Sequence, residues 1–229
     1  MSFNINKTIF KFAFLLTLTL SVSNCSSGND GPNYDTNLII QSTEANIETT
    51  FTSLKVNGKL LSDNGIVSKG ICWSETSKPT INNNKITETT TTFSSLIENL
   101  NPNTTYYFRV FATSNSGTTY SQEKSFTTAS LEETYWQFIV TDHNGNDVSA
   151  KVNLYEDGST KYVRDNCPTC YVPLGTWSLN GKNLTYIGEN ADPALSRHVF
   201  YGTVTGMSLQ GTYEHIEDPD GTWSAVLLP

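Results

Sequence analysis

The chain has 229 residues, of which 37% are hydrophobic and 16% are charged, so two domains with separate cores fit within its length. The 22 acidic residues outnumber the 14 basic residues and give a net charge of −8. No basic stripe offsets this charge, which repels a phosphate backbone, so we do not expect the protein to bind nucleic acid.

The N-terminal residues have the pattern of an export signal. Two lysines precede an apolar run over Phe12–Leu20. This run is shorter than the roughly 20 residues that a membrane-spanning helix needs, and its basic start is typical of a secretory signal. Four small residues then lead to Cys25. The segment resembles the lipobox of bacterial lipoproteins, in which the chain is cut before the cysteine and the thiol is acylated.

This resemblance implies a signal peptide over 1–24 and an anchor in the bacterial outer membrane at Cys25, on its periplasmic or cell-surface face. Asn24 departs from the family, which has Gly or Ala there, and an ordinary signal peptide cleaved nearby is the alternative. Several acyl chains anchor a protein stably. Loss of both leader lysines changes the net charge to −10. Residues 25–36 have almost nothing to bury, which predicts a flexible tether.

Residues 37–128 alternate short apolar runs with turn signals and contain no helical pattern, which predicts a β-sandwich or a β-barrel. Asn57-Gly58 and Asn64-Gly65 are predicted to form tight turns. Cys72 is predicted to be a buried small hydrophobic residue. The predicted strands are Leu38–Ile40, Ala45–Val56, Gly65–Trp73, Thr91–Ile97, Thr105–Ala112 and Tyr120–Phe126.

The segment Leu100–Tyr106 reads Leu-Asn-Pro-Asn-Thr-Thr-Tyr. It resembles the L-x-P-x-T-x-Y corner of fibronectin type III domains, in which the tyrosine hydroxyl bonds to upstream backbone, and this resemblance implies a β-sandwich. The period of two then places Tyr106, Phe108, Val110 and Ala112 on one face, toward the core. In extracellular bacterial proteins such domains often act as spacers, although the fold alone does not define a function.

After a predicted linker over 129–133, residues 134–229 contain eight candidate strands joined by short connections. Neighbours joined by hairpins predict an up-and-down sheet that closes into a barrel, with a second β-sandwich as the alternative. The predicted strands are Tyr135–Thr141, Ala150–Glu156, Thr160–Val163, Gly175–Leu179, Leu184–Gly188, Arg197–Thr205, Ser208–His215 and Gly221–Leu228.

A repeat supports this barrel, because Gly-Thr-Trp-Ser occurs at both Gly175 and Gly221. In each copy the tryptophan is predicted to fill the interior and the glycine to relieve crowding. The segment resembles small bacterial lipocalin-like domains, including their Leu-Asn-Gly turn at Leu179–Gly181. It departs from true lipocalins at Thr134, where their G-x-W signature has glycine.

The positions of two-residue turns predict which residues pair across two of the hairpins. A two-residue turn at Gly206-Met207 pairs Gly202 with Gly211, and a turn at Asn180-Gly181 pairs Trp177 with Leu184. The first turn also pairs Val204 with Leu209, Phe200 with Tyr213 and His198 with His215.

The predicted interior is strongly aromatic and is either mostly filled or holds one small ligand at a mouth. The candidate ligand-pocket residues are Trp136, Trp177, Tyr186, Phe200, Tyr213, Trp223, His198 and His215.

Three other motifs suggest chemistry less strongly. His198 and His215 could ligate a metal, but no Cys, Asp or Glu completes the site, so a solvated polar rim is the better interpretation. Cys167 and Cys170 form a C-x-x-C that no helix follows, which predicts a structural disulfide in an oxidising compartment. The D-x-N-x-N spacing at Asp142 resembles a calcium loop, but a hairpin turn explains it better.

No nucleophile elbow, phosphate-binding loop, haem motif or catalytic carboxylate pair is recognisable, so we predict neither an enzyme nor a bound cofactor or metal. The sequence therefore predicts an all-β, lipid-anchored envelope protein whose barrel binds a small apolar ligand, a glycan or a surface protein. The alternative is a structural or adhesive lipoprotein with a solid barrel core and no small-molecule pocket.

Overall fold

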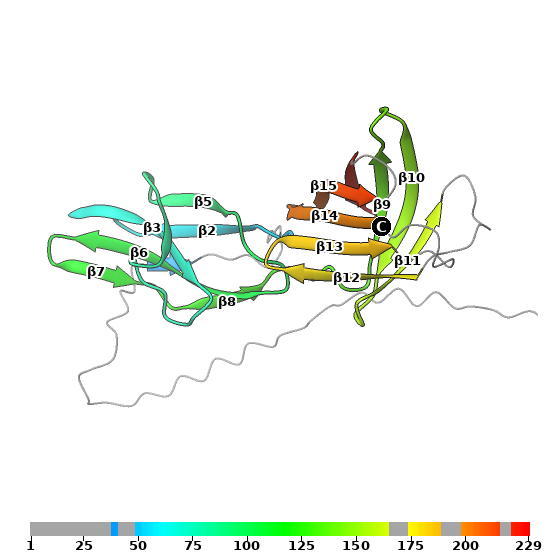
Figure 1. The fold of residues 1–229 in the computed structure, drawn as a ribbon. Helices are drawn as coiled ribbons and strands as arrows, with labels where there is room; N and C mark the ends of the chain where they lie inside the picture. The colour runs from blue at the N-terminus through cyan, green and yellow to red at the C-terminus, as the bar shows by residue number, and fades with distance from the viewer. Residues whose placement is uncertain (1–37, 41–48, 165–173, 189–197, 216–220) are drawn as a thin grey trace, which may run out of the picture. The chain divides into compact units, whose positions relative to one another are not determined.

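A computed structural model describes residues 38–40, 49–164, 174–188, 198–215 and 221–229. Residues 33–229 form one compact unit. Every regular element in the described part of the chain is a strand, and the strands form a β-sandwich and a closed eight-stranded barrel, as the sequence predicts (Figure 1).

The sandwich consists of two antiparallel sheets. One sheet has the order β1-β2-β5 and the other β4-β3-β6-β7, with β8 also paired to β6. The strands are β1 (Leu38–Ile40), β2 (Leu54–Leu60), β3 (Ile66–Ser74), β4 (Asn84–Thr87), β5 (Thr92–Ile97), β6 (Thr105–Ser114), β7 (Gly117–Tyr120) and β8 (Lys124–Thr127). The short β4 was not predicted from the sequence.

The predicted face of β6 lies in the sandwich core, where Tyr106, Phe108, Val110 and Ala112 are each at most 5% exposed. The Tyr106 hydroxyl accepts a hydrogen bond from the Asn101 backbone N–H at 2.9 Å, which confirms the predicted corner contact.

Trp73 packs into the core between the sheets, whereas Cys72, its neighbour in β3, is fully buried on the opposite face. There the buried Arg109 side chain donates hydrogen bonds to the Pro79 carbonyl and lies over the Tyr120 ring at 4.3 Å. Burial raises the pKa of the Cys72 thiol to about 11. Cys72 is therefore the buried structural residue that the sequence predicts.

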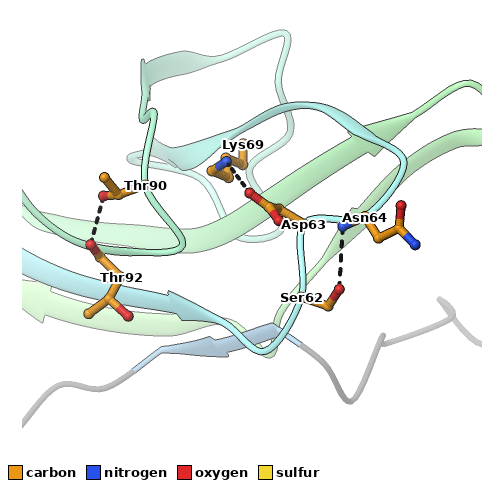
Figure 2. A network of polar contacts seen from close by, with 6 residues as sticks. All are labelled: Ser62, Asp63, Asn64, Lys69, Thr90 and Thr92. Atoms are coloured by element: carbon orange, nitrogen blue, oxygen red, sulfur yellow. Dashed lines mark hydrogen bonds and ion pairs between the residues drawn. The ribbon is translucent and has the colours of Figure 1, made fainter.

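Two predicted turns of the sandwich have different outcomes. The Asn64-Gly65 turn is confirmed, and the Asp63 carboxylate beside it pairs with the buried Lys69 ammonium at 3.3 Å (Figure 2). The prediction at Asn57-Gly58 is wrong, because both residues lie inside β2. Gly58 pairs with Phe93, whose ring occupies the space of the missing side chain.

The eight barrel strands match the eight predicted segments, with differences at some ends. They follow the order β10-β11-β12-β13-β14-β15-β16-β9, so every consecutive pair is a neighbour and the pairing of β16 with β9 closes the sheet. The strands are β9 (Thr134–Thr141), β10 (Asp147–Leu154), β11 (Ser159–Arg164), β12 (Leu174–Asn180), β13 (Asn183–Gly188), β14 (His198–Thr205), β15 (Ser208–His215) and β16 (Gly221–Leu227).

One predicted hairpin register is confirmed and the other is wrong. Around Gly206-Met207 all four predicted pairs occur, including the backbone pairing of His198 with His215. Between β12 and β13, however, the turn residues are Gly181-Lys182, so Trp177 pairs with Tyr186 rather than with Leu184. Gly181 has φ +59° and takes the first turn position. This shift by two residues leaves each side chain on its predicted face.

Aromatic rings fill the middle of the barrel. Phe138 stacks on Trp223 with ring centroids 4.9 Å apart, and it contacts Tyr186 edge-on at 6.0 Å. Phe200 meets Trp223 edge-on at 6.1 Å. These rings come from β9, β13, β14 and β16, so they bridge opposite walls.

Inward-facing glycines make room for these rings. A Cβ atom at Gly202 would overlap the Trp223 ring, and one at Gly221 would lie 2.5 Å from the Tyr213 ring. Gly175 is equally crowded, because a Cβ there would lie 2.6 Å from Thr160 Oγ1. The glycines of the Gly-Thr-Trp-Ser repeat are therefore packing residues, as predicted.

Two residues from outside the barrel strands join the barrel core. Phe51, which precedes β2, is 2% exposed and lies 5.6 Å from the Trp136 ring. Leu131, which precedes β9, is 1% exposed and belongs to the same core. The Phe51 N–H donates to the Gly206 carbonyl at 3.2 Å, and the Gly206 N–H donates to Thr52 Oγ1 at 2.8 Å. Sandwich and barrel therefore share buried residues.

We expect Phe51→Ala to lower the free energy of unfolding by about 3 to 5 kcal/mol, because it removes a ring from a packed core. Urea unfolding followed by tryptophan fluorescence measures this change. The control Leu61→Ala truncates a side chain that is 57% exposed and should change the free energy by less than about 0.5 kcal/mol. Equal effects of the two substitutions would contradict burial of Phe51.

Candidate functional site

The barrel end that carries His198 is the candidate site, and we call it the mouth. Successive strands alternate in direction, so the C-terminal ends of β9, β11, β13 and β15 and the N-terminal ends of the other four meet there. The connections 165–173, 189–197 and 216–220 join these strand ends and lie outside the described residues.

The mouth carries unusually little inward side-chain bulk on β12 and β13. Gly175 and Gly188 pair directly opposite each other on the inward face of these strands. On the wall from β9 and β10, the inward pair is Val140 and Val148, and Val148 is 39% exposed. At the mouth, the inward residues are therefore glycines on β12 and β13 and valines on β9 and β10, and the Thr160 and Tyr186 side chains occupy the space beside Gly175.

The floor of the mouth is an aromatic row. The ring centroids of Tyr186 and Phe200 are 5.1 Å apart, and those of Phe200 and Tyr213 are 5.6 Å apart. His198 lies above this row, 6.3 Å from the Phe200 ring and 6.5 Å from the Tyr213 ring. His198 is half-buried, whereas the three rings are at most 7% exposed. The sequence therefore placed these four candidate residues together correctly.

A buried hydroxyl pair lies at one side of this floor. Burial raises the pKa of the Tyr186 phenol to about 12, and the nearby Thr160 hydroxyl partly opposes this shift. Thr160 is fully buried, and its Oγ1 has no hydrogen bond of standard geometry in the described part of the chain. Both hydroxyls are uncharged at neutral pH, so this side of the floor offers hydrogen bonds rather than charge.

The three tryptophans among the candidate residues lie in different places. Trp136 is fully buried near Phe51, and Trp223 is 3% exposed in the middle of the barrel. Trp177 is half-buried and packs against the core, but it also lines an open groove on the outside of the molecule. The backbone of His215 is at the mouth.

Of the remaining sequence motifs, the structure describes only the one at Asp142. Asp142 forms the predicted hairpin turn, since its carboxylate accepts hydrogen bonds at 2.8 Å from the N–H groups of Asn144 and Asn146. Cys25, Cys167 and Cys170 lie outside the described residues. Within those residues, no group of three His, Cys, Asp or Glu side chains is arranged to hold a metal ion. Nor does the described part of the chain contain a helix that could span a membrane.

Comparison of the chain with protein-family models, with curated proteins and with solved structures gives no match.

Sequence reasoning missed Thr160 and Val148 as parts of the mouth. Thr160 was taken only as the first residue of a strand, yet the period of two from Tyr162 predicts that it faces inward. Val148 fell before the predicted start of its strand, although Ala150 and Val152 share its face. The alternation of inward and outward residues along these strands therefore predicts that both side chains face inward.

The raised pKa of Tyr186 makes stability fall at alkaline pH. In the unfolded chain a tyrosine loses its proton near pH 10, whereas native Tyr186 keeps it to about pH 12. Between these values the unfolded state binds fewer protons, so the free energy of unfolding decreases as the pH rises. We expect Tyr186→Phe to reduce this decrease in the free energy of unfolding at alkaline pH by roughly 2 kcal/mol.

Urea unfolding at pH 9 and pH 11.5 measures this difference. The control Tyr201→Phe changes a tyrosine that is 45% exposed and should leave the wild-type pH dependence intact. If Tyr186→Phe loses as much stability between the two pH values as the wild type does, the phenol is not buried as described.

Proposed function

We propose that the protein is a non-catalytic, lipid-anchored envelope protein whose barrel is a binding module that the sandwich carries away from the membrane. The single observation behind the binding role is the mouth, where small inward residues border an aromatic row flanked by buried hydroxyls. Sites for small ligands are commonly apolar and aromatic with a few polar groups, and barrel mouths are among their usual locations.

The spacer role has support from topology. Leu38 pairs with Leu60 at one end of β2, whereas Thr52, just before the other end, bonds to Gly206 of the barrel. The chain thus enters the sandwich at the end away from the barrel contact. The seven residues of β2 separate these ends by about 20 Å. The two-sheet arrangement and the Tyr106 corner agree with the fibronectin type III resemblance.

The ligand class that suits the mouth is a small, mostly apolar molecule with a hydrogen-bonding group. Rings fill the barrel below the mouth, so a ligand cannot extend deep into the interior. The Tyr186 and Thr160 hydroxyls supply hydrogen bonds but no charge at neutral pH. This favours a partly inserted apolar group over a fully enclosed one.

The ring-filled interior also favours a second candidate, an adhesive or structural lipoprotein that acts only through its outer surface. A solid core stabilises a small barrel without any ligand. The two candidates differ in one respect, which is whether the mouth takes up a small molecule.

Anchoring is tested with Cys25→Ser. We expect the wild-type protein to fractionate with bacterial outer membranes and to incorporate labelled palmitate, because acyl chains bind bilayers by about 0.8 kcal/mol per CH₂ group. The variant should lack the label and leave the membrane fraction. A variant that still sediments with the membrane would refute the lipid anchor.

Ligand uptake is tested by blocking the mouth. Palmitate and haem serve as apolar probes and a malto-oligosaccharide as a polar probe, with binding followed by tryptophan fluorescence. We expect an apolar probe to bind, and Val148→Trp to weaken its binding about tenfold or more by occluding the mouth. The control Ile139→Trp enlarges a similarly exposed residue on the neighbouring strand β9 and should bind like the wild type.

Binding that both substitutions leave unchanged would place the ligand elsewhere. If no probe binds to the wild-type protein, the ligand-binding role fails and the solid adhesive barrel is the function that remains.

A further inference from the structure

A groove lies on the outside of the barrel, and an inference drawn from it does not depend on the function proposed for the mouth. This recess, here called the Trp177 groove, has a cavity volume of about 450 Å³. That is within the range of roughly 300 to 1,000 Å³ found for small-molecule sites. Its walls come from the turns at 101–104, 130–132, 156–158 and 177–181.

Trp177 is a fixed aromatic wall of this groove. Its indole Nε1–H donates to the Tyr155 carbonyl at 2.8 Å, and its backbone N–H donates to the Gly158 carbonyl at 2.8 Å. The polar edge of the indole is therefore already satisfied by protein. Since the side chain is only half-buried and lines the groove, its π surface is the part left for a ligand.

The electrostatics of the groove are acidic. Glu132 and Glu156 line it and are exposed, and neither forms an ion pair within the described residues. No lysine or arginine is among the lining residues. The nearest cation in sequence, Lys182, donates its Nζ–H to Asn99 Oδ1 at 3.1 Å. The groove thus has two carboxylates and one indole among its lining residues and no compensating charge of its own.

We propose that the Trp177 groove binds a small organic ammonium ion. A cation over an indole ring is attracted by the negative face of the π system, and tryptophan gives the strongest such contact among the aromatic side chains. Carboxylates beside the ring add Coulomb attraction for the same charge. An anionic ligand meets repulsion from Glu132 and Glu156, and a neutral one gains nothing from them.

One apolar side chain of the groove suits the alkyl part of such an ion. Leu179 is half-buried and lines the groove together with Trp177, whereas Leu131 is 1% exposed. Methyl groups on a quaternary nitrogen can contact Leu179 and the indole together. A strongly hydrated metal cation makes no such contact, so the groove favours an organic cation.

The test compares two probes of the same shape that differ in charge. Choline carries a quaternary ammonium, and 3,3-dimethyl-1-butanol is its neutral isostere. Titration is followed by the indole Nε1–H signals in NMR spectra, with Trp177→Phe used to assign the Trp177 signal. We expect choline to shift that signal and to bind about fivefold or more tightly than the alcohol. The signals of buried Trp136 and Trp223 serve as internal references.

Substitutions of exposed carboxylates separate binding from folding. We expect Glu132→Gln with Glu156→Gln to weaken choline binding about fivefold. The control Glu214→Gln alters an exposed glutamate on β15 and should have no effect. Raising the ionic strength from 0.01 M to 1 M should weaken binding of choline to the wild type, because the Debye screening length falls from about 30 Å to about 3 Å.

Three results would overturn the proposal. Equal binding of choline and its neutral isostere would exclude recognition of charge. An unchanged Trp177 signal at saturating choline would exclude this groove. Tighter binding of trilysine than of choline, lost in the double Glu→Gln variant, would identify a basic polypeptide as the ligand. None of these outcomes depends on palmitate or haem binding at the mouth.

Discussion

The barrel depends on the contact between inward glycines and aromatic rings. An eight-stranded barrel has an interior just wide enough for its side chains, so a ring fits only where the neighbouring strands leave room for it. Gly202 makes room for Trp223, and Gly221 makes room for Tyr213. The resulting ring cluster bridges the walls and buries the largest side chains of the domain. Because interiors pack at crystal-like density, this fit selects one closed arrangement of the strands.

The same packing joins the barrel to the sandwich. A barrel filled by rings still has an open end, and here Phe51 and Leu131 cover the end that carries Trp136. Both residues come from segments outside the barrel strands. The backbone bond from Phe51 to Gly206 fixes the covering segment to a barrel turn. The barrel core is therefore completed by two residues that do not belong to the barrel strands.

Much of this architecture could be predicted from local patterns. Alternation placed Phe200 and Tyr213 inward, and the Gly206-Met207 turn gave the register of its hairpin. The rule that Asn-Gly forms a tight turn failed at Asn57-Gly58. Gly58 lies within strand β2, where the Phe93 ring covers it. The role of Phe51 could not be predicted, because its partners lie far away in sequence and no periodicity links them. Trp177 had the correct face, but its exposure depends on turns from both domains.

A barrel with a ring-filled middle leaves no room for a ligand at its centre, so both proposed sites lie at its boundaries. Every apolar group in the middle already has protein contacts, so a deep ligand would have to displace rings whose burial stabilises the fold. At the mouth, the paired glycines border an aromatic row with a buried hydroxyl beside it. At the outer groove, a hydrogen bond from its indole N–H holds Trp177, and two glutamates are among the other lining residues. The first proposed site offers hydroxyls and the second offers negative charge, so the two would select different chemistries.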